Sequence, residues 1–231
     1  MDAIDKPTHS LRNKRQQILD AAMRVFGRVG FFRATVEQIA VEAAVAKGSI
    51  YNYFSSKDQM LIDTYLAMIE RINAGIATRS AGTDNVLMQM AIMGHCWMSA
   101  FEALGDATAV LFDFYASCGP SSSDPRFREI KTRVYDESSV ALSRLFAQGT
   151  EEGLFKAQLC DPASSARATI AMTEGLVIQW ILHNKRFNLM EQTLLQTYVY
   201  LNGLLTDLGR RMQQEVDLDA VLNSTHRNVL N

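Results

Sequence analysis

The 231-residue chain has few residues of the kinds that interrupt helices or cross-link small domains. It contains four prolines, and none lies between Pro7 and Pro120, which favours packed helices over a turn-rich sheet protein. Its three cysteines, Cys96, Cys118 and Cys160, are widely spaced and form no Cys-x-x-Cys pair. This pattern argues against a disulfide framework or a zinc site. We therefore expect no metal and no cofactor, and a reducing, cytoplasmic environment.

Long apolar runs are also scarce. The first seventeen residues contain no apolar segment typical of an export signal. The longest stretch without charge, residues 85–101, is at the short end for a membrane span and is interrupted by Gln89, Gly94 and His95. We expect it to form a buried helix, and we expect no membrane partner.

Charge is distributed unevenly along the chain. The total is −2, but the residues up to Lys57 include nine basic and five acidic side chains, a net charge of +4, which leaves −6 for the remainder. With 48% hydrophobic residues, the chain can bury a substantial core. These features indicate a small head that binds a polyanion, followed by a larger acidic body.

The head has the pattern of three short helices. Apolar residues at helical spacing lead to Gly30, a helix stop, and Thr35 with Gln38 forms the capping-box signature of a second helix. The turn 44–46 then precedes a third short helix over 47–54. Two short helices joined by a three-residue turn form a helix-turn-helix, whose second helix can enter the major groove of DNA.

Helical patterns continue to the end of the chain. A capping box of Ser56 and Gln59 opens a long fourth helix. Further helices are expected over 85–104, 106–117, from 125 to an end between 149 and 153, and over 162–184 and 189–214. The sequence therefore predicts an all-α fold, with a three-helix head over residues 1–57 and a helical body over 58–231.

Residues 15–61 resemble the DNA-binding head of the TetR (tetracycline repressor) family. The matching segments, in the family's order and spacing, are QQILDAAMRVF, GFFRATVEQIA, VAKGSIYNYF and SSKDQML. Residues 149–182 are more weakly similar to the family's penultimate helix. The resemblance implies a regulator with a ligand-binding and dimerisation body. We expect a homodimer that binds a palindromic DNA operator and represses transcription until a small lipophilic effector releases it.

The head also carries the side chains that DNA binding needs. Glycine and serine permit close approach, a lysine and an asparagine reach base edges or phosphates, and Thr35 at a helix N-terminus can bind a phosphate. The resemblance adds a phosphate contact for Lys57. Considered individually, the two tyrosines fit core aromatics and the lysines fit solvated charges. The predicted DNA-binding residues are Thr35, Lys47, Gly48, Ser49, Tyr51, Asn52, Tyr53 and Lys57.

Two positions depart from the family's usual pattern. Ala44 replaces the common turn glycine, at a cost of about 1 kcal/mol if the backbone there is left-handed. Ala46 replaces the usual Ser or Thr before the recognition helix and removes a cap worth about 1 kcal/mol. Both changes affect the angle and rigidity of that helix.

Two predicted helices of the body offer apolar stripes for a dimer interface. One recognition helix reads only a few base pairs, so specific binding normally uses two subunits on two half-sites. The resemblance implies a four-helix interface, whereas the stripes alone also fit an intramolecular core. The interface candidates are Ala166, Ile170, Thr173, Val177, Trp180, Leu194, Tyr198, Leu201 and Leu205.

The expected helix 85–104 is apolar on all faces and rich in methionine, which adapts to guests of varied shape. An apolar effector cavity is one interpretation, and plain core packing is the other. The ligand candidates are Met90, His95, Phe101, Phe112 and Tyr115. His95, Glu102 and Asp113 are candidates for polar contacts in such a pocket.

Two rival functions remain at this level. One is an all-helical enzyme, against which the chain lacks P-loop, Gly-x-Ser-x-Gly, His-Glu-x-x-His, dinucleotide-glycine and Glu-x-x-His motifs. We therefore expect no enzyme. The other is a non-specific architectural DNA-binding protein, which the acidic body disfavours.

Overall fold

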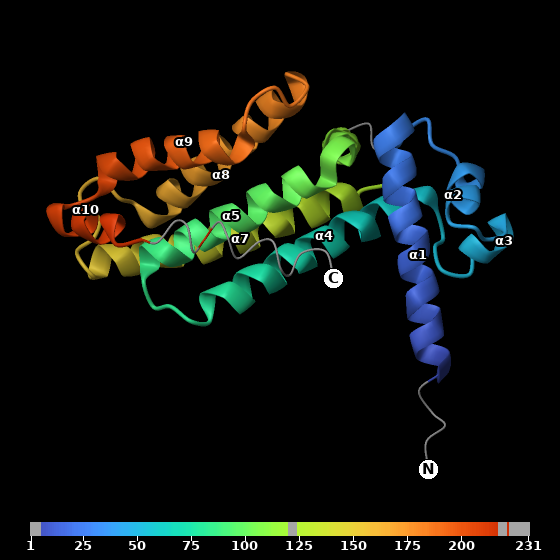
Figure 1. Ribbon diagram of the computed structural model, residues 1–231, viewed down its shortest axis with the longest axis horizontal. Coiled ribbons are helices and arrows are strands. Elements are labelled where there is room, and N and C mark those ends of the chain that lie inside the picture. The colour runs from blue at the N-terminus through green and yellow to red at the C-terminus, as the bar shows by residue number, and fades with distance from the viewer. Residues whose placement is uncertain (1–5, 120–123, 217–220, 222–231) are drawn as a thin grey trace, which may run out of the picture. The chain divides into compact units, whose positions relative to one another are not determined.

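The computed structural model describes residues 6–119, 124–216 and 221, and these are overwhelmingly helical (Figure 1). The prediction of an all-α fold is confirmed. Among the described helices, none combines the length and the apolar character that crossing a membrane requires. The elements are α1 (Lys6–Val29), α2 (Val36–Glu42), α3 (Lys47–Ile50), α4 (Lys57–Ser80), α5 (Val86–Leu104), the 3₁₀ helix η1 (Gly105–Ala109), α6 (Val110–Ser117), α7 (Arg126–Glu151), α8 (Pro162–Leu182), α9 (Leu189–Leu204) and α10 (Asp207–Gln214).

The chain forms two compact units. The first contains residues up to 71 together with 104–131, and the second contains 72–103 together with the residues from 132 onward. The first unit thus includes η1 and α6 as well as α1, α2 and α3. The boundary predicted at residue 57 stays a prediction.

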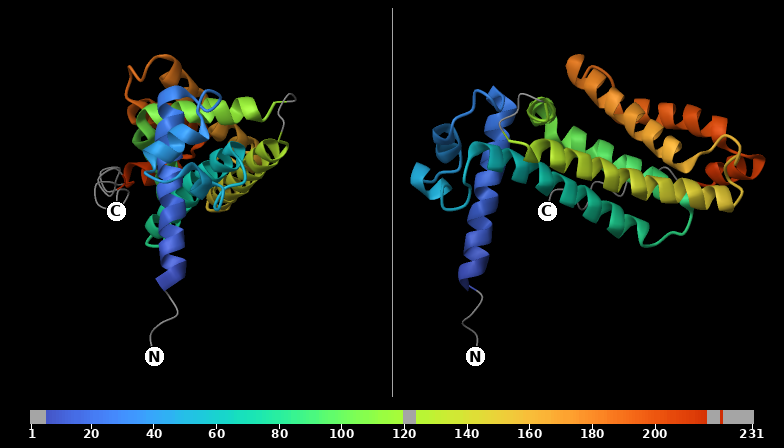
Figure 2. Two further views of the ribbon diagram at one scale, coloured as in Figure 1. Left: turned by 90° about the vertical axis from the view of Figure 1, so that its right-hand side faces the viewer. Right: turned by 180° about the vertical axis from the view of Figure 1, so that it is seen from behind.

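The first unit is built around α1. Figure 1 and the reverse view in Figure 2 show α2 and α3 beside this helix. Ile18 and Phe26 of α1, Ile39 of α2 and Ile50 of α3 are all 0% exposed, so one shared core fixes the three helices. Helix α1 packs closely on η1 at Gly27. A Cβ added there would lie only 2.7 Å from the Cα of Ala107, so this position of α1 has room only for glycine.

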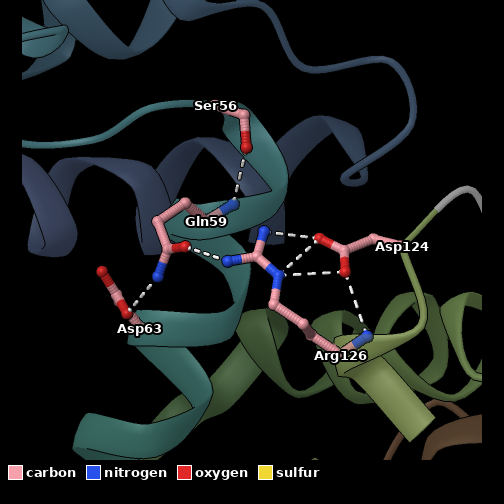
Figure 3. Close-up of polar contacts among 5 residues, drawn as sticks. All are labelled: Ser56, Gln59, Asp63, Asp124 and Arg126. Atoms are coloured by element: carbon pink, nitrogen blue, oxygen red, sulfur yellow. Dashed lines mark hydrogen bonds and ion pairs between the residues drawn. The ribbon is translucent and has the colours of Figure 1, made fainter.

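Helix starts follow the predicted caps. Thr35 accepts from the Gln38 backbone N–H at 3.2 Å, and the Gln38 side chain accepts from the Thr35 N–H at 2.9 Å, which confirms the first capping box. The Gln59 N–H donates to Ser56 Oγ at 3.0 Å (Figure 3). Asp161 accepts from a first-turn backbone N–H of α8 at 2.8 Å. Local sequence therefore sets these boundaries.

Some predicted boundaries are wrong. The third helix ends at Ile50 and continues as a turn, and the expected helix 106–117 begins as the 3₁₀ turn η1. The single helix predicted over 189–214 is two helices, because the chain is extended at Leu205 (φ −66°, ψ 140°) and a new helix begins there with Thr206 as its N-cap.

The break at Leu205 is stabilised by pairing with the segment after α7. Phe155 and Leu205 form an isolated antiparallel bridge. The Lys156 N–H donates to Leu204 O at 2.8 Å, and the Thr206 N–H donates to Leu154 O at 2.9 Å. Two long-range hydrogen bonds and a buried leucine replace a continuous helical turn, which helical periodicity alone does not predict.

The second unit contains an apolar cluster of described residues. Its buried members come from α5, α7, α8, α9 and the segment after α7, and Figures 1 and 2 show α8 and α9 side by side. They are Val86, Leu87, Leu142, Phe146, Leu154, Phe155, Cys160, Ala166, Leu201, Leu204 and Leu205.

Candidate functional site

The two positions at which the sequence departs from the usual TetR-family pattern, Ala44 and Ala46, both affect the backbone of the helix-turn-helix. Ala44 has φ +50°, so its backbone is left-handed and carries the expected cost of about 1 kcal/mol. Ala46 stands at the N-cap of α3 without a side-chain hydrogen bond. The buried Ile50 and the bond from Val45 N–H to Ala40 O, at 3.0 Å, hold α3 against α2 instead.

The predicted DNA-binding residues are mostly accessible. Ile50 anchors α3 while its neighbours face solvent, and a Cβ added at Gly48 meets no atom within 4 Å, so the fold itself does not require that glycine. Their contact with DNA stays a prediction. Thr35, Lys47, Gly48, Tyr51 and Asn52 are exposed, and Ser49, Tyr53 and Lys57 are half-buried.

An acidic residue that the sequence analysis missed lies among the predicted phosphate contacts. The Lys47 ammonium, at the start of α3, forms an ion pair with the carboxylate of Glu37 in the first turn of α2. This hydrogen bond to Lys47 is the main cause that lowers the pKa of Glu37, with a smaller contribution from the Thr35 hydroxyl. Glu37 therefore competes with DNA phosphates for two groups predicted to bind them.

We expect Glu37→Gln to strengthen DNA binding. The substitution removes a negative charge near the phosphates and frees Lys47, so the plot of log affinity against log salt should steepen by up to about 0.9 per subunit. Fluorescence anisotropy over a salt series measures this slope.

Glu42→Gln is the matched control for the Glu37 prediction. It removes the same charge from α2, but Glu42 pairs with Arg24 and Arg28 of α1 and does not contact Lys47. Equal slopes for the two variants would show that Glu37 acts only through net charge.

Lys57 has a different environment from the one that the resemblance implies. Its ammonium donates to Phe31 O at 2.7 Å and to Ala34 O at 2.9 Å, with a longer contact to Phe32 O at 3.4 Å. It also lies 4.5 Å from the Phe31 ring centroid, and burial lowers its pKa. A phosphate contact would require the ammonium to leave these acceptors. We therefore reinterpret Lys57 as the residue that fixes the loop before α2.

The same loop is held from α6. The Phe31 N–H donates to Asp113 Oδ2 at 2.7 Å, so Asp113 binds this residue at its nitrogen while Lys57 binds it at its oxygen. Asp113, expected from sequence as a pocket group, acts here within the first unit. The loop leads directly to Thr35, and its conformation therefore sets the phosphate-binding end of α2.

A polar network in the first unit joins α1, α4 and the start of α7, and Figure 3 shows the part between α4 and α7. Gln59 of α4 donates to Asp63 at 2.8 Å and accepts from Arg126, the first residue of α7, which also pairs with Asp124. Arg15 of α1 binds Asp63 at 2.7 Å. These exposed pairs contribute little to stability individually, but their shared members fix the direction in which α4 begins.

The ligand candidates divide between the units. Met90, His95 and Phe101 lie on α5 in the second unit, with His95 and Phe101 buried. Phe112 and Tyr115 lie on α6 in the first unit. Their joint use by one effector stays a prediction.

His95 has a cationic neighbour that sequence spacing does not predict. Arg79 Nη1 donates to His95 Nδ1 at 2.8 Å and contacts Cys96 Sγ at 3.4 Å. Burial, followed by the charge of Arg79, lowers the pKa of His95 to about 4, so the imidazole is neutral at pH 7. The structure therefore places a neutral acceptor against a half-buried guanidinium.

The predicted dimer stripes are partly covered within the single chain, and their use as an interface stays a prediction. Several candidates are buried within the single chain and belong to its own core, because helices α8 and α9 use those faces to pack inside the second unit. These are Ala166, Val177, Trp180, Leu201 and Leu205. Ile170, Thr173 and Leu194 are half-buried, and Tyr198 is 58% exposed.

An apolar surface remains exposed on α8 and α9. We call it the α8/α9 face and define it as Ile178, Leu182, Leu195, Tyr198 and Val199. Beside it runs an open groove of about 440 Å³. The groove is lined by Met172, Gly175, Leu176, Gln179, Gln192, Leu195 and Gln196.

Comparison with known families is decisive. Residues 18–64 match the model of bacterial regulatory proteins of the tetR family, and residues 100–220, more than half of the chain, match that of the C-terminal part of BetI-type transcriptional repressors. The chain belongs to the TetR family. It is therefore a DNA-binding transcriptional regulator, and the enzyme and architectural alternatives are not favoured.

Individual TetR-family proteins are similar over most of the chain. The transcriptional repressor KstR2 of Mycobacterium tuberculosis is 26% identical over 156 residues, which cover 68% of this chain and 76% of that protein. The structure of FadR from Bacillus subtilis matches with a TM-score of 0.65 and 20% identity, covering 81% of this chain and 95% of that one. A regulator from Saccharomonospora viridis matches with a TM-score of 0.73 and 18% identity, covering 84% and 99%. These structures share the fold.

Proposed function

We propose that this TetR-family regulator represses transcription by binding a palindromic operator as a homodimer, and that a small lipophilic effector releases it. The observation that carries the proposal is the α2–turn–α3 unit. Its apolar side is anchored by Ile50, while Lys47, Tyr51 and Asn52 are accessible to DNA. A short recognition helix of this kind reads one half-site, and a second copy supplies the other.

The α8/α9 face supports the second copy. Its five large apolar side chains lie on two adjacent helices, and an exposed apolar patch of this kind is typical of a protein interface. Two helices from each subunit would form a four-helix interface with two-fold symmetry. We accordingly propose this face in place of the buried residues predicted from sequence.

The relatives support an effector without identifying it. The FadR structure from Bacillus subtilis is a complex with stearoyl-CoA, and the Saccharomonospora viridis regulator is a complex with choline. In this chain α5 has a single acidic residue and many methionines, which suits an apolar guest. We propose that the effector reduces operator affinity because it binds the DNA-free form more tightly.

Disrupting the α8/α9 face tests the proposal. We expect the double variant Leu195→Asp/Val199→Asp to be a monomer and to lose at least about a hundredfold in operator affinity, because each subunit then holds one half-site. Analytical ultracentrifugation gives the oligomeric state. Selection from random DNA supplies the operator, and an inverted repeat is expected.

Val140→Asp is the control for the interface. Val140 is 50% exposed on α7, in the same unit, and lies outside the α8/α9 face. It should leave both the dimer and operator binding intact. A double variant that stays dimeric, or a monomer that binds the operator as tightly as the unaltered protein, would refute this interface.

A further inference from the structure

Arg79 carries a charge that its described surroundings do not balance. It lies in the last turn of α4, in the second unit, with its guanidinium partly buried against α5. Its hydrogen-bond acceptors are the neutral His95 imidazole, the Cys96 sulfur and the backbone carbonyl of Val221. None of the described Asp or Glu residues forms an ion pair with it. A half-buried cation with neutral partners is costly unless an anion joins it.

The donors of Arg79 are also incompletely used. A guanidinium has five N–H groups. In the described part of the chain, Nη1 makes two contacts and Nη2 makes one, which leaves one N–H on Nη2 and the N–H of Nε. Two donors on adjacent nitrogens fit the paired oxygens of a carboxylate or phosphate. The C-terminal end of α4 supplies only about half a negative charge in compensation.

The neighbours of Arg79 on α5 are polar on one side and apolar on the other. Ser99 Oγ lies 3.3 Å from His95 Nδ1, one helical turn along. Trp97 and Phe101 lie beside these residues in sequence, with ring centroids 5.9 Å apart. A molecule at this place would meet a cation and neutral hydrogen-bonding groups.

We propose that Arg79 binds an anionic group of the effector, a carboxylate or a phosphate, and that His95 and Ser99 provide neutral hydrogen bonds beside it. The apolar part of the effector then lies along α5. This assignment rests on the proposed function, because it presumes an effector, and it specifies that effector as a lipophilic anion. A quaternary ammonium ligand is disfavoured, since it would face the guanidinium charge.

Four probes with the same ten-carbon chain test the proposal on the full-length protein. They are decanoate, decanoyl-coenzyme A, decanol and decyltrimethylammonium, and titration calorimetry gives their dissociation constants. We expect at least one of the two anions to bind at least tenfold more tightly than decanol, and the cation to bind most weakly. A preference for decanoate assigns the site to a carboxylate, and a preference for the thioester assigns it to phosphate.

Substitutions at Arg79 identify the source of the preference. Arg79→Gln should abolish the difference between anions and decanol without weakening decanol, and Arg79→Lys should retain most of it. The pKa of His95, measured by NMR, gives a second test that needs no substitution. A bound anion should raise it by offsetting Arg79, whereas decanol should not.

Failure of this inference is distinguishable from failure of the proposed function. An anion preference that survives in Arg79→Gln, a cation that binds as tightly as the anions, or no binding by any probe at 1 mM would overturn the anion site. If the anions bind through Arg79 but leave operator affinity unchanged, the anion site stands and the effector-released repressor is refuted.

Discussion

Replacing Lys57 by methionine is expected to reduce both operator affinity and folding stability. The variant leaves the carbonyls of Phe31 and Ala34 without the ammonium that binds them. Losing hydrogen bonds from a charged donor at partly buried acceptors should lower the free energy of unfolding by about 3 kcal/mol. Because the same loop precedes Thr35, operator affinity should fall at least tenfold, measured by anisotropy alongside chemical unfolding.

Lys47→Met separates this role from a phosphate contact. Lys47 is exposed and pairs with Glu37, so its removal should leave unfolding unchanged and make the salt dependence of DNA binding shallower. Lys57→Met should show the opposite pattern, with weaker binding, lower stability and an unchanged salt slope. A shallower slope with full stability in Lys57→Met would restore the phosphate contact implied by the resemblance.

Gly209→Ala should be the most destabilising single-methyl change in the second unit. A Cβ at this position would lie 2.3 Å from the Leu154 carbonyl oxygen and 2.6 Å from a methyl group of Leu205. The backbone oxygen already accepts from the Thr206 N–H, so moving it away from the added methyl group would weaken that bond. We expect the free energy of unfolding to fall by about 3 kcal/mol, measured by chemical denaturation.

Gly203→Ala is the control for Gly209. A Cβ there meets no atom within 4 Å, and the residue lies in α9, so alanine should leave stability unchanged or raise it by up to about 1 kcal/mol. Equal effects at the two glycines would contradict the close packing of α10 on Leu154.

Features that depend on residues near in sequence were predicted correctly. The capping box at Thr35 and the uncapped start of α3 follow from side chains within a few positions. The box predicted at Ser56 forms only in part, because Ser56 accepts from the Gln59 N–H while the Gln59 side chain binds Asp63 and Arg126 instead. Helix periodicity adds the all-α fold. These signals are local, and a single sequence contains them.

Long-range partners could not be predicted in the same way. Lys57 binds carbonyls 23 to 26 positions earlier, and Arg79 meets His95 across two helices. The broken helix at Leu205 depends on pairing with Phe155, fifty residues away in the chain. Backbone acceptors have no side-chain signature, so their use by a lysine or by an extended segment becomes visible only in three dimensions.

The paired segment at Leu205 also constrains how α9 can move. Sliding α9 along its axis by one residue would break both hydrogen bonds and displace a fully buried leucine. A small tilt about residue 205 keeps the bonds. The sixteen residues of α9 extend about 24 Å, so a tilt of about 5° displaces the start of the helix near Leu189 by roughly 2 Å. Tyr198 and Val199, closer to the pivot, would move through less than half that distance.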